Sequence, residues 1–168
     1  KIVLTTHESA IRIISKEGTL ANPADRDHCL QYMVAVPLLT GDLMAENYED
    51  DYHEQHHILI DGLRRKMVVE EDVSYTKDYH DPSKRSIANA IQVFFKDGTC
   101  TDKVVIEYPI GHKRRRAEGI PILEAKFRAN LATRFIESRC EQIIELCDNQ
   151  AKLEQTPVHE FMDLFMTN

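Results

Sequence analysis

The segment Ile91-Gln-Val-Phe-Phe95, followed by Lys96-Asp-Gly-Thr99 and Val104-Val-Ile-Glu-Tyr108, decides the fold class of this 168-residue sequence. Its two outer parts are rich in β-branched and aromatic residues, which favour strands. Asp97-Gly98 between them is typical of a tight turn whose backbone twist suits paired strands. The segment therefore predicts a β-hairpin over about residues 90–108.

Amphipathic helices are expected on both sides of the hairpin. Asn22-Pro23 indicates the start of a helix that reaches about residue 40, because a capping Asn before Pro is typical of a first helical turn. Apolar residues at helical spacing predict further helices at about 56–66, from 121, at 137–153 and after Pro157. Strands are expected at 2–14 and 67–71, and an ordered loop at 72–86. This mixed order predicts an α+β domain, in which a small mixed sheet packs against several amphipathic helices.

Composition excludes several classes of partner. The length suits about one domain, and 21 basic against 28 acidic residues give a net charge of −7. Because a negative field repels polyanions, we expect no nucleic acid partner and no anionic membrane surface. The longest apolar stretch, residues 32–39, is far shorter than the roughly 20 residues that cross a bilayer. Four cysteines without a C-x-x-C pair indicate reduced thiols inside a cell. The start at Lys1, without Met or a signal peptide, indicates part of a larger protein.

The string His53-Glu-Gln-His-His57 satisfies the H-E-x-x-H pattern of zinc hydrolases. In those enzymes the two imidazoles lie on one helix face and the Glu is a general base. Here the string follows a polar stretch, residues 47–52, where a helix is only beginning, and no third ligand is specified. We interpret it as a solvated, His-rich helix start and expect no metal site.

The only dense basic run in this acidic chain is His112-Lys-Arg-Arg-Arg116. Arginine binds carboxylates through two parallel hydrogen bonds, so Arg114, Arg115 and Arg116 are candidates for binding a di- or tricarboxylate. The alternative is a solvated loop, or one that forms ion pairs with an acidic surface, since charge runs are usually solvated.

Tyr32 lies in the helix expected over about 23–40. A buried tyrosine needs a partner for its hydroxyl, and this one could serve a substrate oxygen or act as an acid. Composition alone favours the alternative, a core tyrosine, because aromatic residues at helical spacing usually pack. Without further information the residues indicate an α+β domain and no defined reaction.

Three blocks, residues 22–33, 78–91 and 107–121, resemble the C-terminal part of the dehydratase branch of the MmgE/PrpD family, and the tail at 153–164 is similar as well. The resemblance implies a two-domain enzyme with a larger helical N-terminal domain. Residues 1–168 would then be its C-terminal α+β lid domain. Most of the family's catalytic residues belong to the helical domain, so this fragment alone is expected to be inactive.

The activity that the resemblance implies is removal of water from 2-methylcitrate to give 2-methyl-cis-aconitate, in the methylcitrate cycle of propionate breakdown. No iron–sulfur cluster or other cofactor is expected. The family's lid tyrosine corresponds to Tyr32. Our hypothesis is that the helical domain supplies the base and that Tyr32 is a donor or acid helper. Arg114 to Arg116 would balance carboxylate charge or fix the lid.

The partners implied are the N-terminal helical domain of the same protein, a tricarboxylate substrate and a second copy in a homodimer. The expected location is the cytoplasm in a bacterium and the mitochondrial matrix in a eukaryote. Two alternatives stay open: a related tricarboxylate enzyme such as a cis-aconitate decarboxylase, and a non-catalytic interaction domain.

Overall fold

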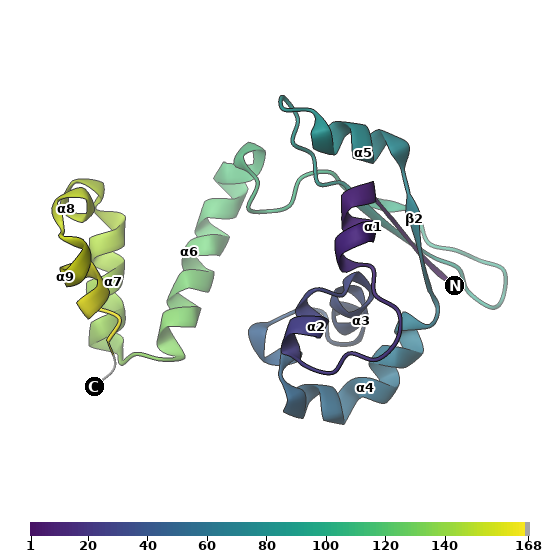
Figure 1. Cartoon of the computed structure of the whole chain (residues 1–168), viewed down its shortest axis with the longest axis horizontal. Coiled ribbons are helices and arrows are strands. Elements are labelled where there is room, and N and C mark those ends of the chain that lie inside the picture. Colours follow the sequence, from purple (N-terminus) through teal and green to yellow (C-terminus); the bar gives the residue numbers. More distant parts are fainter. Residues whose placement is uncertain (167–168) are drawn as a thin grey trace. The chain divides into compact units, whose positions relative to one another are not determined.

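The computed structural model describes residues 1–166, which form an α+β arrangement of nine α-helices, two short 3-10 helices and one four-stranded sheet (Figure 1). The chain divides into two compact units, unit 1 (Lys1–Pro109) and unit 2 (Ile110–Asn168). The sheet lies in unit 1, whereas the described part of unit 2 is helical. The α+β class is therefore confirmed. No helix in the described range is both long and apolar enough to cross a bilayer.

The sheet is mixed, with the strand order β2-β1-β3-β4. Its strands are β1 (Ile2–Thr6), β2 (Met67–Glu71), β3 (Asn89–Val93) and β4 (Val104–Ile106). Strand β1 pairs parallel to β2 and antiparallel to β3, and β3 pairs antiparallel with β4. The β-hairpin and the strand at 67–71 are thus confirmed. At the hairpin tip Gly98 has a φ of 88°, which glycine adopts without steric cost.

The expected strand over 2–14 is wrong beyond Thr6, because residues Glu8–Ile14 form helix α1. His7 is the N-cap, and its Nδ1 accepts a hydrogen bond from the backbone N–H of Ala10 at 3.2 Å. A side chain that accepts from the first turn starts a helix even where β-branched residues follow. The histidine cap therefore outweighs the strand preference of the three isoleucines that follow.

The helix expected over about 23–40 is two helices, α2 (Pro23–Asp27) and α3 (Leu30–Thr40). Asn22 caps α2 as predicted, with its side chain accepting from the N–H of Asp25 at 2.9 Å. Cys29 is extended, with a φ of −123° and a ψ of 106°, and separates the two helices. Helix α3 ends at Gly41, whose φ of 90° is the left-handed conformation typical of a helix end.

Two further predictions for unit 1 need correction. Helix α4 (Asp50–Arg64) follows a 3-10 turn, η1 (Ala45–Tyr48), and begins six residues before the predicted start at 56. The predicted loop at 72–86 contains helix α5 (Val73–His80), which the carboxylate of Asp72 caps by accepting from the N–H of Ser74 at 2.8 Å. Helix α5 has no buried residue, so its sequence contains no stripe of apolar residues at helical spacing that would indicate a helix.

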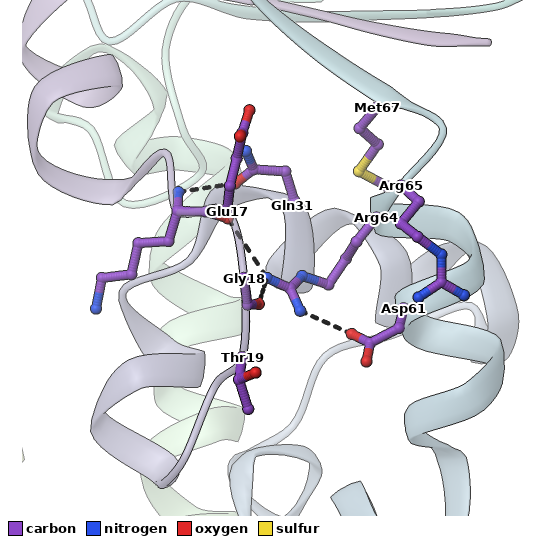
Figure 2. A pocket seen from close by; sticks show the side chains of 9 residues that line it. Glu17, Gly18, Thr19, Gln31, Asp61, Arg64, Arg65 and Met67 are labelled. Carbon is purple, nitrogen blue, oxygen red and sulfur yellow. Dashed lines mark hydrogen bonds and ion pairs between the residues drawn. The ribbon is translucent and has the colours of Figure 1, made fainter.

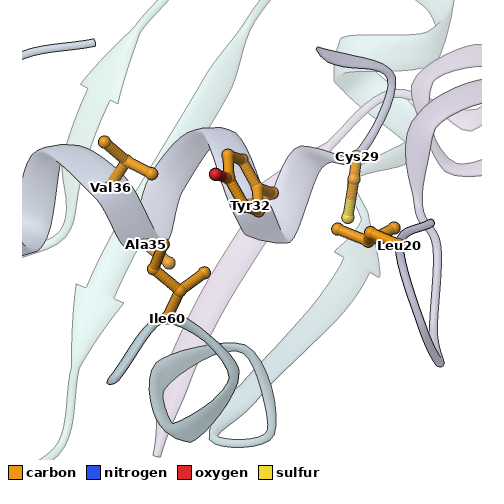
Figure 3. Packing of buried hydrophobic residues seen from close by; sticks show 6 residues of the cluster. All are labelled: Leu20, Cys29, Tyr32, Ala35, Val36 and Ile60. Carbon is orange, nitrogen blue, oxygen red and sulfur yellow. The ribbon is translucent and has the colours of Figure 1, made fainter. Parts of the chain in front are cut away.

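The core of unit 1 packs α3 against α4 (Figure 3). Its six buried residues are Leu20, Cys29, Tyr32, Ala35, Val36 and Ile60. Full burial of each large apolar side chain stabilises the fold by about 1.5–3 kcal/mol. The core thus fixes α3, which carries Tyr32.

Unit 2 consists of η2 (Lys113–Arg115), α6 (Arg116–Ala132), α7 (Glu137–Asp148), α8 (Gln150–Gln155) and α9 (Val158–Asp163). Helix α6 begins five residues before the predicted start at Pro121. The helix expected over 137–153 is interrupted at Asn149, whose side chain accepts from the N–H of Lys152 and so caps α8. A separate apolar cluster that includes Leu131, Ile143 and Ile144 holds α6 and α7 together.

Candidate functional site

Tyr32 lies in the first turns of α3 and is completely buried (Figure 3). Its hydroxyl donates a hydrogen bond to the backbone carbonyl oxygen of Asn47 at 2.6 Å. Asn47 belongs to η1 and is itself buried. The hydroxyl therefore joins α3 to η1 in the described conformation, and it does not reach the surface of unit 1.

Burial controls the acidity of this phenol. It raises the pKa of Tyr32 to about 12, while the positive charge of Arg26 opposes the shift. The hydroxyl thus carries its proton at neutral pH and can donate it in a hydrogen bond. The rings of Tyr48 and His53 lie 6.1 Å and 5.8 Å from the Tyr32 ring, centroid to centroid. The phenol is therefore enclosed by aromatic groups.

Arg26 is a buried cation beside this cluster, with only 1% of its surface exposed. Its Nε donates to the carbonyl oxygen of Tyr48 at 2.6 Å, and its Nη2 forms an ion pair with Asp50. These contacts fix the end of η1 and the start of α4 next to Tyr32. Sequence reasoning missed this residue, because one Arg between two acidic residues gives no sign that it is buried.

Helix α4 begins at Asp50, so the string His53–His57 lies near the start of this helix, as the sequence indicated. The two histidine rings are 5.9 Å apart, centroid to centroid, and tilted. Burial lowers the pKa of His53, and the charge of Arg26 lowers it further. His57 Nδ1 lies 2.9 Å from the carbonyl oxygen of Glu54, to which it donates. Among residues 1–166 no three His, Cys, Asp or Glu side chains are grouped as metal ligands. That this chain binds no metal stays a prediction.

The arginine run lies in unit 2, whereas Tyr32 lies in unit 1. Arg115 binds Glu118 through one edge of its guanidinium, with Nε donating to Oε2 at 2.9 Å and Nη2 donating to Oε1 at 2.5 Å. These hydrogen bonds lower the pKa of the Glu118 carboxyl. Arg114, in the middle of η2, and Arg116, at the start of α6, are exposed. A substrate carboxylate at Arg115 would therefore compete with Glu118.

Unit 1 also contains a polar hollow of about 550 Å³ (Figure 2). Arg64 at the end of α4 lines it, with Nη1 donating to Asp61 at 2.7 Å and Nη2 to the Gly18 carbonyl at 2.9 Å. The exposed Arg65 and the side chain of Lys16 add two further cations, while Glu17 adds a carboxylate. The hollow thus combines charges of both signs. Sequence reasoning missed it because its residues come from three distant segments, although the basic triplet at 64–66 was a signal.

An apolar groove of about 350 Å³ lies elsewhere in unit 1, between α3 and the sheet. Its walls include Met33 and Leu38 of α3 and Val104 and Ile106 of β4. The groove therefore leaves part of the apolar surface of α3 open within the described residues.

Comparison with known proteins identifies the family. A model described as "MmgE/PrpD C-terminal domain" matches residues 1–150. This chain belongs to the MmgE/PrpD family. The resemblance in the three sequence blocks is therefore confirmed.

Relatives within the MmgE/PrpD family match almost the whole chain. It is 54% identical over 166 residues to the 2-methylcitrate dehydratase of Escherichia coli (strain K12), covering 99% of this chain and 34% of that protein. It is 55% identical over 164 residues to that of Cupriavidus necator, covering 98% and 34%. A protein of Yarrowia lipolytica named "2-methylcitrate dehydratase, mitochondrial" is 45% identical over 165 residues, covering 98% and 31%. The chain spans about a third of the length of these relatives, which carry a separate N-terminal part.

The family match runs across the boundary between the two units at Pro109. It includes α6 and α7 of unit 2 together with the whole of unit 1. The assignment of residues 1–168 to a single lid domain is not tested by this match and stays a prediction.

Proposed function

We propose that this chain is the C-terminal portion of an iron-independent 2-methylcitrate dehydratase. The full-length enzyme is a hydro-lyase that converts 2-methylcitrate to 2-methyl-cis-aconitate and water in propionate breakdown. The observation that carries this proposal is 54–55% identity, over nearly the whole chain, to bacterial proteins that bear this name.

Elimination of water needs a base that removes a carbon-bound proton and an acid that protonates the departing hydroxyl. In the proposed division of labour the N-terminal domain supplies the base, and Tyr32 donates a proton or a hydrogen bond to the leaving oxygen. The high pKa of Tyr32 keeps its hydroxyl protonated, which suits a donor. Contact with a substrate requires the hydrogen bond to the Asn47 carbonyl to open.

Charge develops beside the carboxylates of a tricarboxylate during the reaction, and cationic donors stabilise it. We assign this role to Arg114, Arg115 and Arg116. The exposed side chains of Arg114 and Arg116 support the assignment. The Nε–Nη2 edge of Arg115 takes part only if it exchanges Glu118 for the substrate.

A related activity on another tricarboxylate, such as decarboxylation of cis-aconitate, is the alternative within the family. The test is an assay of the full-length protein with 2-methylcitrate and with cis-aconitate, with products identified by mass spectrometry. We expect 2-methyl-cis-aconitate from the first and no itaconate from the second. Release of carbon dioxide from cis-aconitate without dehydration of 2-methylcitrate would overturn the proposal. The 168-residue chain, assayed in parallel, is expected to be inactive.

The non-catalytic alternative has its own test in the same full-length protein. If this chain were only an interaction domain, changes at Tyr32 would not alter turnover. We further propose a homodimer, located in the cytoplasm of a bacterium or the mitochondrial matrix of a eukaryote. Bacterial relatives and one named as mitochondrial support these locations.

A further inference from the structure

Strand β4 is an edge of the sheet that nothing within residues 1–166 pairs on its outer side. Its three residues are apolar and exposed: Val104 at 55%, Val105 at 47% and Ile106 at 50%. An exposed apolar edge strand offers backbone N–H and C=O groups to another strand. It is therefore a surface on which a further strand can dock.

The opposite edge of the same sheet differs in charge. Strand β2 ends in the exposed carboxylates of Glu70 and Glu71, and charged side chains on an edge discourage pairing. Strand β4 has no charge within it. It is flanked by one cation, Lys103, and one anion, Glu107, both exposed. Only the β4 edge therefore has an apolar centre with opposite charges at its ends.

The order of charged and apolar residues over 103–107 is self-complementary, so two copies of this strand can pair with each other. In an antiparallel pair of two copies centred on Val105, Val105 lies opposite Val105, Val104 lies opposite Ile106, and Lys103 lies opposite Glu107. Residues directly opposite in such a pair share a face, so every apolar side chain meets an apolar one and each charge meets its opposite. A register shifted by one or two residues places Lys103 or Glu107 against a valine or isoleucine. The sequence 103–107 thus selects one symmetric register.

The same edge continues into the apolar groove, because Val104 and Ile106 form its wall opposite Met33 and Leu38 of α3. Leu38 is itself 46% exposed. A second copy paired at β4 would extend the sheet and add apolar surface beside this groove. The strand sets the register of the pair, and the neighbouring apolar side chains add buried area.

We propose that β4 pairs with β4 of a second copy of this protein, antiparallel and centred on Val105. The two sheets then form one continuous sheet across a two-fold axis, with a Lys103–Glu107 ion pair at each end of the contact. This inference names the interface of the homodimer proposed above. It does not depend on which reaction the enzyme catalyses.

Charge reversal with rescue is the first test, made on the full-length protein by sedimentation equilibrium. Lys103→Glu and Glu107→Lys each place like charges opposite twice, so either change should raise the dimer Kd by about tenfold. The double variant restores both attractions and should return the Kd to within about threefold of wild type. Glu70→Lys, on the β2 edge, is the matched control and should leave the Kd unchanged. Circular dichroism verifies that each variant folds.

Cross-linking is the second test, in a Cys100→Ser background that removes the exposed native thiol. Val105→Cys places two thiols opposite each other, at the roughly 4.5–5.5 Å Cβ separation of paired residues, and mild oxidation should link the copies. Val68→Cys on β2, 40% exposed, is the control and should not cross-link.

Three results would overturn the proposal. They are a monomeric protein, a double variant as dissociated as the single ones, and cross-linking at residue 105 no faster than at residue 68. Any of these would show that β4 does not pair with β4 of a second copy. Dehydration of 2-methylcitrate is assayed separately, so failure of the pairing and failure of the proposed function are distinguishable.

Discussion

The hydroxyl of Tyr32 donates to the carbonyl oxygen of Asn47 at 2.6 Å, and both residues are buried. This hydrogen bond joins α3 to η1 across the core of unit 1. Tyr32, which we propose contacts the substrate, thus also stabilises the packing of unit 1 through this hydrogen bond. Its two roles, packing and donation to substrate, are separable because they affect different measurements.

Tyr32→Phe keeps the ring and removes the hydroxyl. We expect the free energy of unfolding to fall by about 1 kcal/mol, because the buried carbonyl of Asn47 loses its donor. The catalytic proposal further expects turnover of the full-length enzyme, at saturating 2-methylcitrate, to fall by roughly 10²-fold. Turnover within about threefold of wild type would contradict the catalytic role and leave Tyr32 as a core residue.

Alkaline pH should destabilise the fold through the same residue. A tyrosine whose pKa is raised from 10.0 to about 12 by folding binds its proton more tightly in the folded state. Its contribution is complete below about pH 10 and is lost as the pH rises towards about 12, by roughly 3 kcal/mol in total. The measurement is urea unfolding of wild type and Tyr32→Phe across this range. We expect the stability advantage of wild type over Tyr32→Phe, about 1 kcal/mol at neutral pH, to fall with rising pH and then to reverse, because the loss of roughly 3 kcal/mol exceeds it. A constant difference would contradict the prediction.

Two glycines in helices should respond to alanine with opposite signs. An added Cβ at Gly119 in α6 would lie 2.2 Å from the carbonyl oxygen of Ile110, so the backbone must move. Gly119→Ala should therefore lower the stability of unit 2 by about 1–3 kcal/mol. Gly62 in α4 has nothing within 4 Å of an added Cβ, and Gly62→Ala should stabilise by up to about 1 kcal/mol. Thermal unfolding tests both, and a Gly119→Ala variant as stable as wild type would refute the contact.

The elements that the sequence predicted correctly are those that depend on short patterns of neighbouring residues. The Asp97-Gly98 turn and the strand at 67–71 depend on residues close together in the chain. The sequence did not predict α1, because a histidine cap decided it, or α5, because that helix buries no residue. The break at Cys29 also gave no signal, since no Gly or Pro lies between residues 24 and 36.

In the candidate site, the sequence identified only Tyr32, because its position in a helix follows from neighbouring residues. Tyr32 was placed on a helix and proposed to be either buried or functional, and its burial is now seen. Arg26 and the hollow at Arg64 were missed, because their contacts join segments 22 to 48 residues apart. Such contacts follow from tertiary packing, which no local pattern encodes.

The three arginines of the basic run should contribute unequally to substrate binding. Arg116→Gln is expected to raise the KM for 2-methylcitrate by about tenfold, because one charge-assisted carboxylate contact contributes about 1.5–3 kcal/mol. Arg115→Gln should raise the KM less, since Glu118 already binds the Nε and Nη2 donors of its guanidinium. Steady-state kinetics of the full-length enzyme measure both, with Lys126→Gln on the same helix as the control for lost charge. If Lys126→Gln raises the KM as much as Arg116→Gln does, the run acts through net charge alone and its assignment as a carboxylate site is wrong.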